Sequence, residues 1–176
     1  MDEQELLGGI PPEELEKFLT FRKKVEGANI SPQSLLATDY LNHFNEIIMM
    51  LEMIPDMPDC LEEAQNWHPK SYQDHFRDSS FSDKELAIAA YDNVPTKFRQ
   101  PFEETIGQMN RLVEAAVSRA DRAIAEDAPV EQLAEITHSA SRGLQLLMDH
   151  ASGIIHGSIK TMDQEEIDTM LAIHQL

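Results

Sequence analysis

The sequence predicts an all-α protein, a helical bundle built on a long antiparallel αα-hairpin and followed by a short amphipathic helix at the C-terminus. Three observations predict this class. Apolar residues recur at three- and four-residue steps over most of the 176 residues, as they do on one face of a helix. The seven Gly and nine Pro fall mostly between these periodic segments. No alternating run of Val, Ile or Thr indicates a strand.

Two helices are expected in the first third of the chain. One is expected over about 11–25, because Pro11 and Pro12 suit the first turn of a helix and Gly27 would stop it. The next is expected over 33–54 and ends where two further prolines follow. Its apolar face consists of Ala37, Leu41, Phe44, Ile48, Leu51 and Ile54.

Shorter helices are expected in the less regular segment that follows. One is predicted near 59–65, and one or two turns near 70–76. Ser82 and Glu85 match a capping box that would open a helix through Tyr91. A group of aromatic and histidine side chains in this segment either caps the open end of the bundle, the commoner outcome, or lines a pocket or partner surface. These residues are Trp67, His68, Tyr72, His75 and Phe76.

Two long amphipathic helices then form the expected hairpin. Pro95 would begin a segment that Pro101 restarts, and the apolar stripe after it consists of Phe102, Ile106, Met109, Val113, Ala116, Ala120 and Ile124. The sequence Asp-Ala-Pro at 127–129 predicts a tight break. The second helix carries the stripe Leu133, Ile136, Ala140, Leu144, Leu147, Ala151 and Ile154. Because the break is short, the two helices should be antiparallel neighbours.

Composition narrows the class of partner and the compartment. There are 32 Asp and Glu against 14 Lys and Arg, a formal net charge of −18, which argues against binding to nucleic acid or to an anionic membrane surface. The one cysteine, Cys60, cannot form an internal disulfide and fits a reducing compartment. The N-terminal residues lack the pattern of a signal peptide. We therefore expect a cytoplasmic protein with a bundle domain, 1–156, and a linker with a terminal helix, 157–176.

The segment 162–171 predicts a short acidic amphipathic helix. Asp163 is placed as its N-cap with Glu166 at the third helical position, a pair typical of a capping box. Beneath the acids runs a narrow apolar stripe formed by Ile167, Met170 and Leu171. Such a helix can lay its stripe into a groove while its acids meet basic residues of a partner. The alternative is a terminal helix folded back onto its own bundle.

This segment, MDQEEIDTML, resembles the docking peptides of the flagellar switch protein FliM and of the CheZ-type chemotaxis phosphatases. These peptides share an acid or Gln, then Ile-Asp, then two apolar residues, and both families use them to bind the phosphorylated response regulator CheY. The resemblance implies bacterial signal transduction, with a CheY-like receiver domain as partner. The residues that would bind it are Met162, Asp163, Glu166, Ile167, Asp168, Met170 and Leu171.

A second stretch resembles the catalytic region of the CheZ-type phosphatases. Their Phe-Gln-Asp-Leu-Thr-Gly-Gln corresponds here to Phe-Glu-Glu-Thr-Ile-Gly-Gln at 102–108, with Glu in place of Asp and Thr-Ile in place of Leu-Thr. The resemblance implies that Glu104 pairs with a receiver lysine and that the Gln108 amide orients a water toward the acyl phosphate, a role of positioning rather than deprotonation. It implies no cofactor of this chain, since the receiver would hold the Mg²⁺.

The tether between the bundle and the terminal helix limits how these two regions could act. Residues 157–161 span at most ~18 Å when fully extended. By this estimate the docking segment and Gln108 would engage one receiver together only across a homodimer.

Other hypotheses stay open. The chain could be a non-catalytic bundle adaptor of unknown partner. His138 resembles the phosphorylated histidine of phosphotransfer domains, although Arg-Gly follows one residue later than the usual Lys-Gly. Glu135 and His138 have the Glu-x-x-His spacing of di-iron bundles, but a single motif facing away from the apolar stripe predicts no metal site. A methionine cluster fills the core or forms an adaptable partner surface, and it consists of Met49, Met50, Met53 and Met57.

Overall fold

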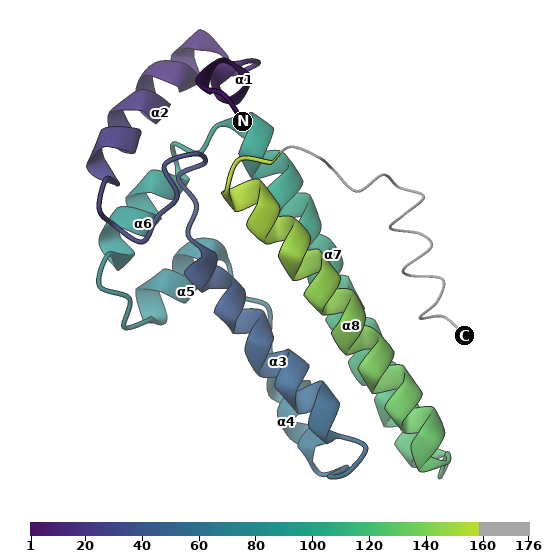
Figure 1. The fold of residues 1–176 in the computed structure, drawn as a ribbon. Helices are drawn as coiled ribbons and strands as arrows, with labels where there is room; N and C mark the ends of the chain where they lie inside the picture. Colours follow the sequence, from purple (N-terminus) through teal and green to yellow (C-terminus); the bar gives the residue numbers. More distant parts are fainter. Residues whose placement is uncertain (159–176) are drawn as a thin grey trace. The chain divides into compact units, whose positions relative to one another are not determined.

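The computed structural model describes residues 1–158, in which eight α-helices and one 3₁₀ helix occur and no strand (Figure 1). The predicted all-α class is therefore confirmed. This part of the chain divides into two compact units. Unit 1 contains 1–41, 70–105 and 150–158, and unit 2 contains 42–69 and 106–149. None of the helices in residues 1–158 has the length and apolar character needed to cross a bilayer.

Unit 1 begins with two helices joined by a short turn. α1, Glu3–Leu7, is capped by Asp2, whose side chain accepts a hydrogen bond from Glu5 N at 2.7 Å. α2, Pro12–Lys24, has proline in its first turn and three basic residues in its last turn, which suits the helix dipole. The sequence predicted α2 closely, but it did not predict α1.

The segment 31–41 of unit 1 turns instead of starting a long helix. Ser34 Oγ donates to the backbone oxygen of Ile155 at 2.5 Å and accepts from Leu36 N at 3.1 Å. Leu35 between them has a φ of 69°, which a helix does not allow. A serine hydroxyl bonded to the backbone in this way competes with helix formation. The predicted helical start at residue 33 is therefore wrong.

An aromatic core holds the rest of unit 1 together. Rings from the 3₁₀ helix Thr38–Leu41, from α5 (Tyr72–Asp78) and from α7 (Thr96–Ala125) contact one another with centroids 4.8 to 6.1 Å apart. Tyr40 Oη donates to Lys70 O at 2.7 Å, while Tyr72 Oη accepts from Ala37 N at 2.8 Å. Burial raises the pKa of Tyr40 to about 12.

α6, Lys84–Tyr91, completes the short helices of unit 1 and packs against α5. Its end was predicted correctly. Its N-cap is Asp83, whose side chain makes no capping hydrogen bond, so the predicted capping box at Ser82 is wrong.

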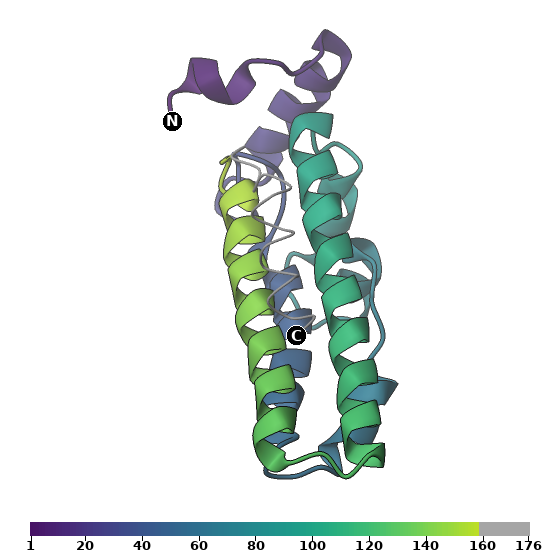
Figure 2. The same ribbon diagram turned by 90° about the vertical axis from the view of Figure 1, so that its right-hand side faces the viewer.

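Unit 2 contains α3, Asn42–Met53, and α4, Cys60–Asn66, which contact each other. The two long helices, α7 (Thr96–Ala125) and α8 (Val130–Ile155), contribute to both units. Their stretches in unit 2 run side by side in opposite directions in Figures 1 and 2, as the hairpin prediction requires. The break between them contains Asp127 with a φ of 51°.

Most residues of the predicted apolar stripes are buried, but Ile124 and Ile136 are only half-buried. In unit 2 the buried side chains of α7 are Ile106, Met109, Leu112, Val113, Ala116, Ala120 and Ala123. The buried apolar side chains of α8 are Leu133, Ala140, Leu144 and Leu147, and those of α3 are Phe44, Ile47, Ile48 and Leu51. One detail of α7 differs from the prediction: the helix continues through Pro101 and does not restart there.

Candidate functional site

The seven residues predicted to bind a receiver domain lie outside the described residues. Met162, Asp163, Glu166, Ile167, Asp168, Met170 and Leu171 all fall in 159–176. The terminal helix and its docking role therefore stay predictions. The remaining candidate residues lie on α7, on α8 and in the segment after α4, and their surroundings can be described.

Glu104 and Gln108 lie on α7, four residues apart along one uninterrupted helix. This spacing places them on the same side of the helix. Glu104 is exposed and Gln108 is partly exposed, whereas Phe102 and Ile106 are buried. Glu104 Oε1 accepts a hydrogen bond from Gln100 Nε2 at 3.1 Å. The Glu104 carboxylate is thus held in place along its own helix while remaining open to solvent.

Gly107 stands beside this pair and has no packing reason to be glycine. A Cβ added at Gly107 would meet one side-chain atom, Arg111 Nη1, at 3.4 Å, which is ordinary contact with the end of a flexible side chain. A glycine inside a helix costs about 1 kcal/mol of stability relative to alanine. The packing of the described residues does not account for this cost. Gly107 is partly exposed, and the neighbour that a Cβ would meet is the flexible end of Arg111.

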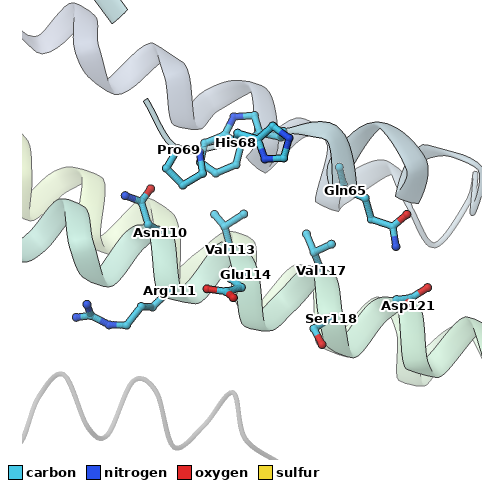
Figure 3. Close-up of a pocket in the computed structure, with 12 residues that line it drawn as sticks. Gln65, His68, Pro69, Asn110, Arg111, Val113, Glu114, Val117, Ser118 and Asp121 are labelled. Atoms are coloured by element: carbon cyan, nitrogen blue, oxygen red, sulfur yellow. The ribbon is translucent and has the colours of Figure 1, made fainter. Parts of the chain in front are cut away.

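A groove lies in unit 2, where the residues after α4 face α7 (Figure 3). Its volume is about 400 Å³, in the range of small-molecule sites. Pro69 and His68 face Asn110 and Val113 across the groove in Figure 3. The complete lining is Ala64, Gln65, Trp67, His68, Pro69, Asn110, Arg111, Val113, Glu114, Val117, Ser118 and Asp121.

Trp67 forms part of this wall in a fixed orientation. Its Nε1 donates to the backbone oxygen of His43 at 3.3 Å, and its ring stacks on the His43 ring with centroids 4.6 Å apart. The sequence left open whether the Trp67–Phe76 segment caps the bundle or lines a pocket. The pocket alternative holds for Trp67 and His68, which line the groove, whereas Tyr72 and Phe76 are buried in unit 1.

The polar lining of the groove does not favour one ligand charge. Arg111 is cationic, whereas Glu114 and Asp121 are anionic, and all three are exposed. Asn110 Oδ1 is buried and has no hydrogen-bond partner among the described residues. An unpaired buried carbonyl is costly, and no described residue offsets this cost. Sequence periodicity marked Val113 as a core residue but could not pair α7 with residues 64–69.

The histidine and carboxylate candidates on α8 are solvent-facing. His138 and Glu135 are both exposed. Arg142, one turn after His138, donates from Nη2 to Ser139 Oγ at 3.1 Å. Within residues 1–158, no cluster of three or more His, Cys, Asp and Glu side chains is arranged to hold a metal ion.

Comparison with known proteins adds no assignment to this geometry. No protein-family model, curated protein or solved structure matches the chain.

Proposed function

We propose that this chain is a signalling protein that docks a CheY-like receiver domain through residues 162–171. The observation that carries the proposal is the sequence MDQEEIDTML, which resembles the CheY-binding peptides of two families. A capped helix that presents Ile167, Met170 and Leu171 offers an apolar stripe to a groove, and its acids suit a basic rim. The net charge of −18 also favours a partner with a basic surface.

The proposal has a catalytic extension at α7. Glu104 would pair with a lysine of the receiver, and Gln108 would orient a water for in-line attack on the aspartyl phosphate. The P–O bond to the aspartate would then break and release inorganic phosphate. The extension is supported by the exposure of Glu104, the partial exposure of Gln108 and a glycine between them that the packing does not require. Any Mg²⁺ in this reaction belongs to the receiver, and a non-covalent positioning role suits an amide side chain.

Docking is tested by titrating the full chain with a CheY receiver domain that beryllofluoride, a mimic of the phosphoryl group, holds in its active conformation. We expect the double variant Ile167→Ala/Leu171→Ala to bind at least ~10-fold more weakly, because two apolar anchors are lost. Thr169→Ala is the matched control, since residue 169 lies off the stripe. Equal binding by the wild type and the double variant would overturn the docking proposal.

Catalysis is tested separately by following the decay of a phosphorylated receiver. Wild-type protein should speed the decay and Gln108→Ala should not, while Gln132→Ala, an exposed glutamine on α8, should behave as wild type. Docking without any acceleration would identify a non-catalytic adaptor and remove the role of Glu104 and Gln108. Because the two assays use different variants, each part of the proposal can fail on its own.

A further inference from the structure

A row of exposed methionines lies on unit 2, and none of its residues takes part in the function proposed above. Met49 and Met53 on α3 are 58% and 39% exposed, and Met57 in the following turn is 53% exposed. Met57 N donates to Met53 O at 2.9 Å, which keeps Met57 one turn beyond Met53. The four-residue spacing puts the three side chains on one side of the segment. We call Met49, Met53 and Met57 the methionine face.

The methionine face is not needed for the core of unit 2. The opposite side of α3 already supplies four buried side chains, Phe44, Ile47, Ile48 and Leu51, of which three are completely inaccessible to solvent. The three exposed methionines therefore give this segment more apolar surface than its packing into the core requires. Methionine has a flexible, polarisable side chain, and surfaces rich in it adapt to partner helices.

The stretch of chain that carries the methionine face is acidic and contains no Lys or Arg. Between Lys24 and Lys70 the chain contains eight Asp and Glu and no Lys or Arg. Four of these acids flank the three methionines in sequence, and all four are exposed: Glu46, Glu52, Asp56 and Asp59. Helical spacing places Glu52 and Asp56 in the row next to Met49 and Met53. Glu52 Oε1 also accepts a hydrogen bond from Ser141 Oγ at 2.6 Å, which fixes this edge of the face.

We propose that the methionine face binds a basic amphipathic helix of another protein. The apolar side of such a helix would cover the three methionines, and its Lys and Arg would meet the flanking acids. A second copy of this chain fits less well, because its corresponding surface carries the same negative charge. This interaction goes beyond the receiver docking proposed above, since it uses neither 162–171 nor Glu104 and Gln108.

The probe is a synthetic 14-residue helix of leucine and lysine with its leucines on one side, titrated into the full chain. Binding should be visible as a gain in peptide helicity by circular dichroism and as a saturating anisotropy change of a labelled peptide. The double variant Met49→Gln/Met53→Gln should weaken binding at least ~10-fold, because two apolar contacts become polar. Leu146→Gln, at a leucine of α8 that is 52% exposed, is the matched control and should bind as wild type.

Charge is tested with a second pair of variants. Glu46→Gln/Asp56→Asn should weaken binding several-fold at low salt, whereas Glu131→Gln/Glu135→Gln on α8 should leave it unchanged. A peptide of the same composition with leucines spread around the helix should bind more weakly than the amphipathic one. The proposal is overturned if the methionine variant binds as wild type, if the two acid variants weaken binding equally, or if both peptides bind alike. Equal melting temperatures of the variants would show that the fold is retained, and the receiver assay remains independent of all of them.

Discussion

At the scale of single residues, Glu14 shows how a carboxylate on one helix can accept hydrogen bonds from the first residue of another helix. Glu14 Oε2 accepts a hydrogen bond from Thr96 N at 3.0 Å, and Oε1 accepts one from Thr96 Oγ1 at 2.5 Å. Thr96 is the first residue of α7, where backbone N–H groups lack helical partners. These hydrogen bonds lower the pKa of Glu14, because they favour its charged form. A side chain on α2 thus supplies what a local N-cap would.

Replacing Glu14 with alanine should therefore cost about 1 kcal/mol of folding free energy at pH 7, the usual cost of losing a helix cap. The pKa of Glu14 is lower in the folded than in the unfolded protein, so its stabilisation is present above the unfolded value near 4.5 and is lost as pH falls. Urea unfolding of the wild type and Glu14→Ala at pH 7 and near pH 3.5 measures the difference. Glu13→Ala, an exposed acid beside it, should change little at either pH.

At the scale of secondary-structure elements, α7 carries a proline that a regular helix disfavours. Pro101 is in the second turn of α7, and the helix continues past it for 24 residues to Ala125. Proline has no N–H, so the carbonyl of Lys97 lacks its helical hydrogen-bond donor. Burial explains why α7 nevertheless continues, since Phe98 and Phe102 on either side of Pro101 are almost completely buried. Tertiary packing outweighs the local preference here.

Pro101→Ala should stabilise the protein by about 1 kcal/mol. The variant regains the hydrogen bond to Lys97 O and the helix propensity of alanine, which together exceed the loss of proline's restriction of the unfolded chain. Pro12→Ala is the matched control, because proline suits the first turn of α2 and its removal should bring no gain. Thermal and urea unfolding of both variants give the comparison. A Pro101→Ala protein that is less stable than the wild type would mean that the contacts of the proline ring contribute more stability than the alanine variant gains.

The elements that the sequence predicted well are those with a long apolar period. The stripes of α7 and α8 were predictable because burial repeats over many turns and a short Asp-Ala-Pro break separates them. The segment 31–41 was not, because the hydrogen bond that fixes it joins Ser34 to Ile155, 121 residues away. α1 was missed because its five residues bury only Leu6. Long-range pairing also hid the groove, whose two walls come from residues 64–69 and 110–121.

At the scale of the whole molecule, the dominant property is an excess of negative charge. The formal net charge of −18 arises from 32 acids against 14 bases in 176 residues. The bases are absent from 25–69, so the charge is uneven along the chain as well as large. Like charges repel more in the folded state than in an expanded chain, where they lie farther apart. This repulsion lowers the stability of the folded state, and dissolved salt can screen it.

Stability should accordingly rise with ionic strength. Between 10 and 200 mM NaCl the Debye length falls from about 30 Å to less than 10 Å, which screens repulsion between acids on different helices. We expect Tm to increase by a few °C, a gain of about 1 kcal/mol for a chain of this size. Choline chloride at equal ionic strength should act similarly, since screening does not depend on which cation supplies it.

A charge variant separates screening from other effects of salt. Glu135→Lys/Asp149→Lys replaces two exposed acids on α8 and raises the net charge by four. If repulsion limits stability, this variant should melt at a higher temperature than the wild type at 10 mM NaCl and gain less from added salt. A Tm that does not change with NaCl, or a variant with the same salt dependence as the wild type, would contradict the repulsion argument. An unchanged salt dependence in the variant would point to ion binding at particular sites, because general screening must weaken as the magnitude of the net charge falls.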